Sequence, residues 1–324
     1  MLATAAPRAV FQHETVLRDE VLALLGPALG EGRIAVDCTA GGGGHTEALL
    51  STGATVVAID KDPAALAALE ERLGGCPRLR VVPGDFREVE ALLEAHHLGP
   101  VDALLADLGV SSPQLDTPAR GFSFRHPGPL DMRMDPTRGV PLSERLASVD
   151  LPELTRILRD YGEERRARRI ARALIEARDA GRLGDTADLA RVVEAAAGPA
   201  AGRLHPATRT FQALRIWVND ELGALEALLD ALPRLLAPGG RAAIVSFHSL
   251  EDRRVKQRFR ALAQGRVHPP GVPVRQTEEG APFEILTPRA CVPSEAERRR
   301  NPRARSARLR AIRRVGAPGE GGAQ

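Results

Sequence analysis

The chain has 324 residues, a formal net charge of +3 and 43% hydrophobic residues. This length exceeds one ordinary domain, so we expect one large domain with an insertion or a second module. Three widely spaced cysteines, Cys38, Cys76 and Cys291, exclude a disulfide framework or a zinc site built on paired cysteines. No signal peptide or bilayer-length apolar run is recognisable, so we expect a cytoplasmic protein without membrane contact.

Strand and helix patterns alternate over the first third of the chain. β-branched and apolar runs predict the strands, and Asp62-Pro63 supplies an N-cap and a first helical residue. Such β-α units indicate an α/β fold with a doubly wound, Rossmann-like parallel sheet, which binds ligands at the carboxyl ends of its strands. The expected strands are Ile34–Val36, Thr55–Ile59, Leu79–Val82 and Val101–Ala106, and the expected helices include Ala64–Leu73 and a segment through Leu92 and Leu93.

A glycine-rich turn, Asp37-Cys-Thr-Ala-Gly-Gly-Gly-Gly-His45, follows the first strand. Glycines let the backbone bend tightly and approach a nucleotide cofactor, and such turns serve nicotinamide, flavin and S-adenosylmethionine (SAM) enzymes. The dinucleotide fingerprint requires a third glycine where this chain has Thr46 or Glu47. The acidic residue before the turn, Asp37, instead favours SAM; the structural alternative is that the glycines serve turn geometry alone.

Polar residues at later strand ends extend the predicted cofactor site. Asp60 lies about twenty residues after the glycine turn, where a carboxylate can accept both hydroxyls of an adenosine ribose. Asp85 could accept from an adenine amino group, and Phe86 could pack on the adenine face. For Phe86, a core aromatic that closes a strand is an equally good interpretation.

From Ser111 to Pro206 the β-α alternation stops, and we interpret residues 113–206 as a mainly helical insertion for RNA recognition. A turn-rich loop over 111–140 has the length of a lid or binding element. One helix carries a basic stripe, Arg165, Arg168, Arg169 and Arg172, opposite an apolar face, which suits phosphate contacts or a merely solvated surface. The expected helices are Ser143–Val149, Leu151–Tyr161, Glu163–Ala180 and Thr186–Ala197.

The chain then returns to the sheet domain, which we assign to residues 1–112 and 207–316, with a flexible tail over 317–324. One long helix, Pro206–Ala231, is expected, with a polar face that contains Arg215 and Asn219. Strands are expected over Arg241–Phe247, Phe283–Leu286 and Ala307–Ile312, the last preceded by a connection rich in arginine. The eight histidines show no ligand spacing with Cys or acidic residues, so no metal is expected.

Several motifs carry a resemblance to a known family, the bacterial small-subunit ribosomal RNA methyltransferase H family. They follow the family's order over nearly the whole chain. The matching stretches are Gly41–His45, Asp107–Asp116, Arg120–Phe124, Gly128–Pro136, Tyr161–Arg165, His205–Gln212, Ser246–Arg253 and Asn301–Ser306.

The resemblance implies a class I SAM methyltransferase that methylates the exocyclic N4 amine of one cytosine in the decoding region of 16S rRNA, within the small ribosomal subunit. Asp107, at the end of the fourth strand, is our candidate for the catalytic group that orients this amine. The aromatic that stacks on the base is open among Phe122, Phe124 and Phe247. The SAM contacts that the resemblance implies are Gly43, Gly44, His45, Asp60, Phe86, Asp107 and Gln114, and the candidate substrate contacts are Phe124, Arg165, Arg169, Arg215, Asn219 and His248.

Two other classes of protein remain as alternatives. A nicotinamide-dependent oxidoreductase would share the sheet and Asp60 but should have the third glycine. A non-catalytic ribosome-assembly factor would keep the fold and the basic helix with a dead cofactor pocket, whereas Gly43, Gly44, Asp60 and Asp107 are all present here. The sequence leaves the oligomeric state open, a homodimer included.

Overall fold

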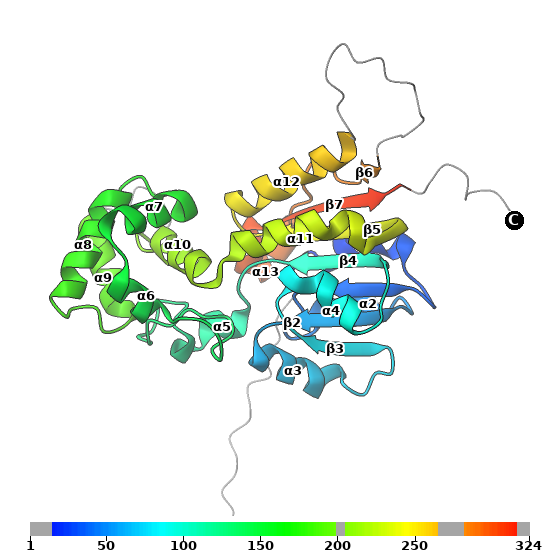
Figure 1. The fold of residues 1–324 in the computed structure, drawn as a ribbon, viewed down its shortest axis with the longest axis horizontal. Helices are drawn as coiled ribbons and strands as arrows, with labels where there is room; N and C mark the ends of the chain where they lie inside the picture. The colour runs from blue at the N-terminus through cyan, green and yellow to red at the C-terminus, as the bar shows by residue number, and fades with distance from the viewer. Residues whose placement is uncertain (1–14, 199–204, 265–281, 316–324) are drawn as a thin grey trace, which may run out of the picture.

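The computed structural model describes residues 15–198, 205–264 and 282–315, and the predicted tail over 317–324 lies outside these residues. A seven-stranded sheet with strand order β3-β2-β1-β4-β5-β7-β6 forms the centre of one lobe, and helices of the insertion form a second lobe beside it (Figure 1). The predicted doubly wound, Rossmann-like α/β fold is confirmed. The strands are β1 Ile34–Asp37, β2 Thr55–Asp60, β3 Leu79–Pro83, β4 Val101–Asp107, β5 Leu236–Ser246, β6 Phe283–Ile285 and β7 Arg308–Arg314.

The sheet is mixed, which corrects the expectation of a parallel sheet. Strands β1 to β5 run parallel, but β7 is antiparallel to both β5 and β6. The pairing of Ser246 with Arg308 shows that β7 begins where β5 ends. The chain therefore enters β7 from the carboxyl edge of the sheet, by which we mean the edge where β1, β2, β4 and β5 end.

Helices cover both faces of the sheet because successive strand residues point to opposite sides. Val36 and Leu104 pack on one side with helices α4, α11 and α12, whereas Ala35 and Leu105 pack on the other with α1 and α2. Helix α3 begins as predicted, since the side chain of Asp62 accepts from the Ala64 N–H at 3.0 Å. These helices are α1 Arg18–Leu25, α2 Gly44–Leu50, α3 Pro63–Leu73, α4 Val89–Ala95, α11 Glu221–Leu235 and α12 Ser249–Gln264.

The insertion has a hydrophobic core of its own, with Leu154, Ile157, Ile170 and Leu189 fully buried. Helix α10 also contributes to this core, beyond the predicted boundary at residue 206. Helix α8 begins four residues later than predicted, because Glu163 ends α7 in the left-handed conformation (φ 48°). The helices of this lobe are α5 Ser112–Asp116, α6 Leu142–Ser148, α7 Leu151–Gly162, α8 Ala167–Asp179, α9 Thr186–Ala197 and α10 Thr208–Asn219.

The prediction of one continuous helix over Pro206–Ala231 is wrong. Asp220 adopts a left-handed conformation (φ 47°) and separates α10 from α11. Aspartate tolerates this conformation better than most residues, and the change of direction lets α10 pack in the insertion while α11 packs on the sheet. The apolar residues of the predicted single helix therefore belong to two helices, which pack in two different hydrophobic cores.

Among the described residues, no helix combines the length and the apolar character that a membrane span requires.

Candidate active site at the carboxyl edge of the sheet

Three aspartates end neighbouring parallel strands at the carboxyl edge. Asp37 ends β1, Asp60 ends β2 and Asp107 ends β4, and β1 lies between the other two strands. Parallel pairing brings the ends of such strands together, so the predicted cofactor and catalytic carboxylates share one edge.

The glycine turn joins β1 to α2 around the buried side chain of Asp37. Thr46 donates its hydroxyl to one carboxylate oxygen of Asp37 at 2.7 Å, and the Thr39 N–H donates to the other at 3.2 Å. Gly41 and Gly43 have φ of +51° and +83°, a region that favours glycine. A Cβ at Gly43 would lie only 2.7 Å from the Leu69 side chain. The absence of a side chain at this position therefore allows the turn to pass close to α3.

Asp60 ties the glycine turn to β2. Its Oδ2 accepts from the Gly41 N–H at 2.8 Å, and its Oδ1 accepts from the Asp62 N–H at 2.9 Å. Burial raises the pKa of Asp60 to about 6, although these two hydrogen bonds oppose the shift. The sequence-predicted ribose acceptor therefore lies against the turn, as a cofactor site requires.

Asp107 lies beside His45, the first residue after the glycines. The Nε2 atom of His45 is 3.6 Å from Oδ2 of Asp107, and Thr39 accepts from the Asp107 N–H at 2.6 Å. Burial alone would lower the pKa of His45, but the carboxylates of Asp107 and Asp37 together outweigh burial and raise that pKa above its usual value of 6.5.

The pair of Asp107 and His45 has buried polar atoms without hydrogen-bond partners. Within the described part of the chain, Oδ1 of Asp107 and both ring nitrogens of His45 form no hydrogen bond. Buried polar atoms are normally satisfied, so unpaired ones at the end of a strand indicate where a ligand binds.

Two other predicted cofactor residues, Phe86 and Gln114, lie at the same edge with protein partners. Phe86 begins a short 3-10 turn, Phe86–Glu88, and packs partly buried against the core of the sheet lobe. Gln114 donates to Asp62 at 2.8 Å and accepts from the Ser111 N–H at 3.0 Å, which makes a capping box for α5. Arg120 donates to the same oxygen of Asp62 at 2.8 Å, a link to the insertion that we did not predict and that has no local sequence signal.

The predicted substrate residues of the insertion lobe are partly engaged inside the protein. Phe124 stacks on His205 with ring centroids 4.4 Å apart and meets Phe211 edge-on. The amide of Asn219 donates to the Met132 carbonyl at 2.8 Å and accepts from the Met134 N–H at 2.7 Å. Asn219 thereby holds the long loop of the insertion against α10.

Arg215 and His248 belong to a buried charged cluster between the two lobes. Arg215 makes two hydrogen bonds of 2.8 Å with Glu221, and His248 lies 3.1 Å from Glu251. The carboxylate of Glu251 also accepts from the N–H groups of Phe247 and His248.

This cluster corrects one expectation about the histidines. His248 and Glu251 are three residues apart and face each other, and His45 and His205 also lie beside acidic residues. Ligand atoms of Glu221, His248 and Glu251 lie within 4.8 Å of one another, a separation that a metal ion could bridge. Arg215, however, already engages both carboxylate oxygens of Glu221, so the buried charge is balanced by an arginine.

The basic stripe of α8 has the predicted two faces. Ala167, Ile170, Ala171 and Leu174 are buried. Arg165, just before the helix, and Arg168, Arg169 and Arg172 within it are exposed, and none of them pairs with a carboxylate in the described residues.

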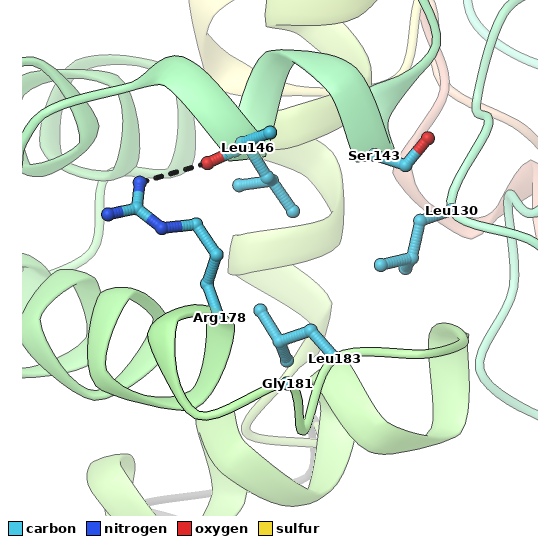
Figure 2. Close-up of a pocket in the computed structure, with 7 residues that line it drawn as sticks. Leu130, Ser143, Leu146, Arg178, Gly181 and Leu183 are labelled. Carbon is cyan, nitrogen blue, oxygen red and sulfur yellow. Dashed lines mark hydrogen bonds between the residues drawn. The ribbon is translucent and has the colours of Figure 1, made fainter.

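A separate pocket of about 130 Å³ lies inside the insertion lobe (Figure 2). Arg178 lines it and donates to the Leu146 carbonyl at 3.0 Å. The other lining residues are Leu130, Ser143, Ala147, Gly181 and Leu183. The pocket contains none of the strand-end carboxylates, so it is not the cofactor site.

The chain has relatives among known proteins over nearly its whole length. The chain is 55% identical over 308 residues to Ribosomal RNA small subunit methyltransferase H of Anaeromyxobacter dehalogenans, covering 94% of this chain and 98% of the relative. It is 53% identical over 305 residues to the protein of the same name from Myxococcus xanthus, with the same coverage. Among solved structures, a putative methyltransferase from Streptococcus mutans in complex with SAH is 13% identical, with a TM-score of 0.40 over 94% of this chain and 100% of that one. A family model described as the MraW methylase family matches residues 10–315, and the chain therefore belongs to this family.

Proposed function

We propose that this protein is a SAM-dependent methyltransferase that modifies the exocyclic N4 amine of a cytosine in the decoding region of 16S rRNA. Family membership and the names of the relatives support methylation of small-subunit rRNA. The observation that carries the proposal is the buried, unpartnered Oδ1 of Asp107 at the end of β4, next to the glycine turn. A cytoplasmic reaction follows from an rRNA substrate.

The residues at the carboxyl edge fit SAM. The glycines of the turn carry no side chains, so a cofactor can lie against the backbone. The space beside Gly42 is open, since a Cβ there would meet no atom within 4 Å. Asp60 supplies a carboxylate for the ribose hydroxyls, and Phe86 supplies an aromatic side chain at the adjacent strand end. When bound, SAM supplies a methyl group on a sulfonium centre. Gly43, Gly44, His45 and Gln114 complete the proposed binding residues.

Asp107 orients the target amine. The lone pair of a cytosine amine is delocalised into the ring, which makes this nitrogen a poor nucleophile. A carboxylate oxygen that accepts from one N–H of the amine favours a geometry in which the lone pair leaves the ring plane. His45 lies beside Oδ2, so Oδ1 is the oxygen left for the amine and for the proton that the amine loses. Alignment in a buried site supplies most of the acceleration.

Phe247 is the aromatic candidate that lies beside the residues following the catalytic strand. A Cβ on Gly109, two residues after Asp107, would be 3.5 Å from the Phe247 ring. Phe122 and Phe124 instead pack in the core of the insertion. We therefore favour Phe247 for stacking on the target base.

The insertion supplies the RNA-binding surface on its side of the site. Arg165 and Arg169 are exposed without carboxylate partners in the described residues, which leaves them available for phosphate groups. Arg215, Asn219, Phe124 and His248 shape the junction and the long loop through the contacts described above.

Transfer of label from methyl-labelled SAM tests the proposed function. Small ribosomal subunits from cells that lack this enzyme should gain label, whereas large subunits should not. SAM should also raise the melting temperature of the protein and NADH should not, because only a ligand that binds the folded state stabilises it. SAM binding without label transfer would support a non-catalytic assembly factor, and stabilisation by NADH alone would support an oxidoreductase.

A further inference from the structure

The arginine-rich connection before β7 forms a second basic surface, which the proposed function does not use. It consists of helix α13, Glu295–Arg300, and the 3-10 turn Pro302–Ser306. Its exposed arginines are Arg298, Arg299, Arg300, Arg303 and Arg305, and we call them the C-terminal arginine surface.

This surface lies at the carboxyl edge of the sheet. β7 runs antiparallel to β5, with Arg308 opposite Ser246, and Val245 lies opposite Asp107 on β4. The segment that leads into β7 therefore emerges at the same edge as the catalytic carboxylate. In Figure 1, α13 is drawn on the side of the sheet that faces the insertion.

Two contacts attach the C-terminal arginine surface to the walls of the site. Arg303 pairs with Asp116, the last residue of α5, a helix that begins five residues after Asp107. The buried carboxylate of Glu297 accepts from the Leu17 N–H at 2.8 Å. Thr15, two residues before Leu17, fills the space at Gly44 in the glycine turn, where a Cβ would lie 2.0 Å from its hydroxyl. The surface thus borders both the cofactor turn and the catalytic strand end.

The charge of this surface is incompletely neutralised by the protein. Arg299 pairs with Glu295 and Arg303 with Asp116. Arg298 and Arg305 pair with no carboxylate within the described parts of the chain. Because unpaired arginines beside an active site attract anions, their presence here favours an anionic partner.

We propose that the C-terminal arginine surface binds the phosphate backbone of the substrate RNA next to the target nucleotide, on the side of the site formed by the sheet lobe. This inference rests on the proposed function, since it takes RNA as the substrate. Each basic surface holds one flank of the target while the base enters the site between the two lobes. Arginine suits this contact because its planar guanidinium can donate two hydrogen bonds to one phosphate.

The test compares Arg298→Ala/Arg305→Ala with a matched double variant, Arg80→Ala/Arg260→Ala. Arg80 on β3 and Arg260 on α12 are also exposed and also pair with no carboxylate in the described residues, but they lie away from the carboxyl edge. Binding to small ribosomal subunits that lack the modification is measured by filter binding over a range of salt concentrations. SAM binding and the melting temperature of both variants should match those of the wild type.

Loss of two phosphate contacts should weaken binding roughly 15- to 30-fold at about 0.15 M salt and reduce the slope of log K against log salt by about 1.4–1.8. The control variant should bind within about twofold of the wild type. If the wild type methylates the RNA but Arg298→Ala/Arg305→Ala binds it with wild-type affinity and salt slope, the proposed role of this surface is wrong. If the wild type binds the subunits without methylating them, the proposed activity is wrong. A reduced salt slope for the double variant would then still support RNA binding by this surface.

Discussion

Among the strand-end carboxylates, Asp107 differs from Asp37 and Asp60 in its hydrogen bonding. Both oxygens of Asp37 and both oxygens of Asp60 accept hydrogen bonds from the protein. One oxygen of Asp107 is buried without a partner among the described residues. The first two carboxylates thus hold the turn in place, and the unpartnered oxygen of Asp107 is the one that we propose binds the substrate.

Asp107→Asn should lower the single-turnover rate of methyl transfer by about 100-fold or more, since a positioned proton acceptor contributes at least that much. The amide keeps the size of the side chain, so the melting temperature should change little. The rate is measured at saturating SAM with small subunits as substrate. A wild-type rate would remove Asp107 from the mechanism.

Asp60 predicts a pH dependence of stability. Its pKa is about 6 in the folded protein and 3.8 in the unfolded chain, so the folded state binds more protons between these values. The contribution of this residue to the free energy of unfolding should therefore fall by about 2 kcal/mol as pH rises from about 4 to about 6.5.

Comparison of the wild type with Asp60→Asn isolates this contribution, because Asp37 and His45 titrate in both proteins. Denaturant unfolding at pH 4.5 and 7 should show a smaller loss of stability for the variant. Equal losses would show that the Asp60 carboxylate is not destabilised by burial. The variant should also bind SAM more weakly, since an amide cannot accept from both ribose hydroxyls.

At the scale of the element, two glycines of the same turn have different surroundings. Gly43→Ala places a Cβ 2.7 Å from Leu69 and requires φ of +83°, so it should destabilise the protein by about 1–3 kcal/mol. Gly42→Ala meets nothing within 4 Å and should leave the unliganded protein's melting temperature unchanged. Thermal unfolding without SAM measures both, and equal effects would contradict this geometry.

The sequence predicts the elements that have strong local signals. The structure confirms the strands before Asp60 and Asp107, the cap at Asp62 and the helix Thr186–Ala197, because each depends on neighbouring residues. The break at Asp220 was missed because the apolar periodicity continues through it. The direction of β7 could not be read from a short apolar run, which is compatible with either direction of pairing.

Long-range partners explain what the sequence could not reveal about the site. Gln114 and Arg120 meet at Asp62, which is more than fifty residues away in the chain. Arg215 is a predicted RNA contact, but in the structure it pairs with Glu221 on the other side of the break at Asp220. The prediction of one continuous helix did not include this break. Polar residues on a helix face indicate that a partner exists, but only the fold shows whether it belongs to the protein.

At the scale of the whole molecule, contacts at the carboxyl edge join the two lobes. Glu163, which ends α7, hydrogen bonds with Ser249 and lies 3.2 Å from Arg253 of α12. Asp62 receives Arg120 from the insertion, and the cluster of Arg215, Glu221, His248 and Glu251 lies at the junction. These contacts fix the insertion beside the carboxyl edge, where we propose that it presents RNA to Asp107.

The basic stripe predicts a specific kinetic effect. Arg169→Ala should raise the KM for small subunits by about fivefold at about 0.15 M salt, through loss of one phosphate contact, and leave kcat unchanged. Arg182→Ala is the control, because Arg182 is also exposed on the same lobe but lies outside the stripe. Equal KM values for both variants would show that the stripe is only a solvated surface.

The chemical identity of the methylated nucleoside tests the central claim most directly. Small subunits lacking the modification are incubated with SAM and the wild-type enzyme or Asp107→Asn, and the 16S rRNA is digested and analysed by nucleoside mass spectrometry. We predict N4-methylcytosine in the decoding-region fragment with the wild type, and greatly reduced amounts with the variant after a short incubation. Absence of N4-methylcytosine, or a methyl group on another atom of the base, would contradict the account.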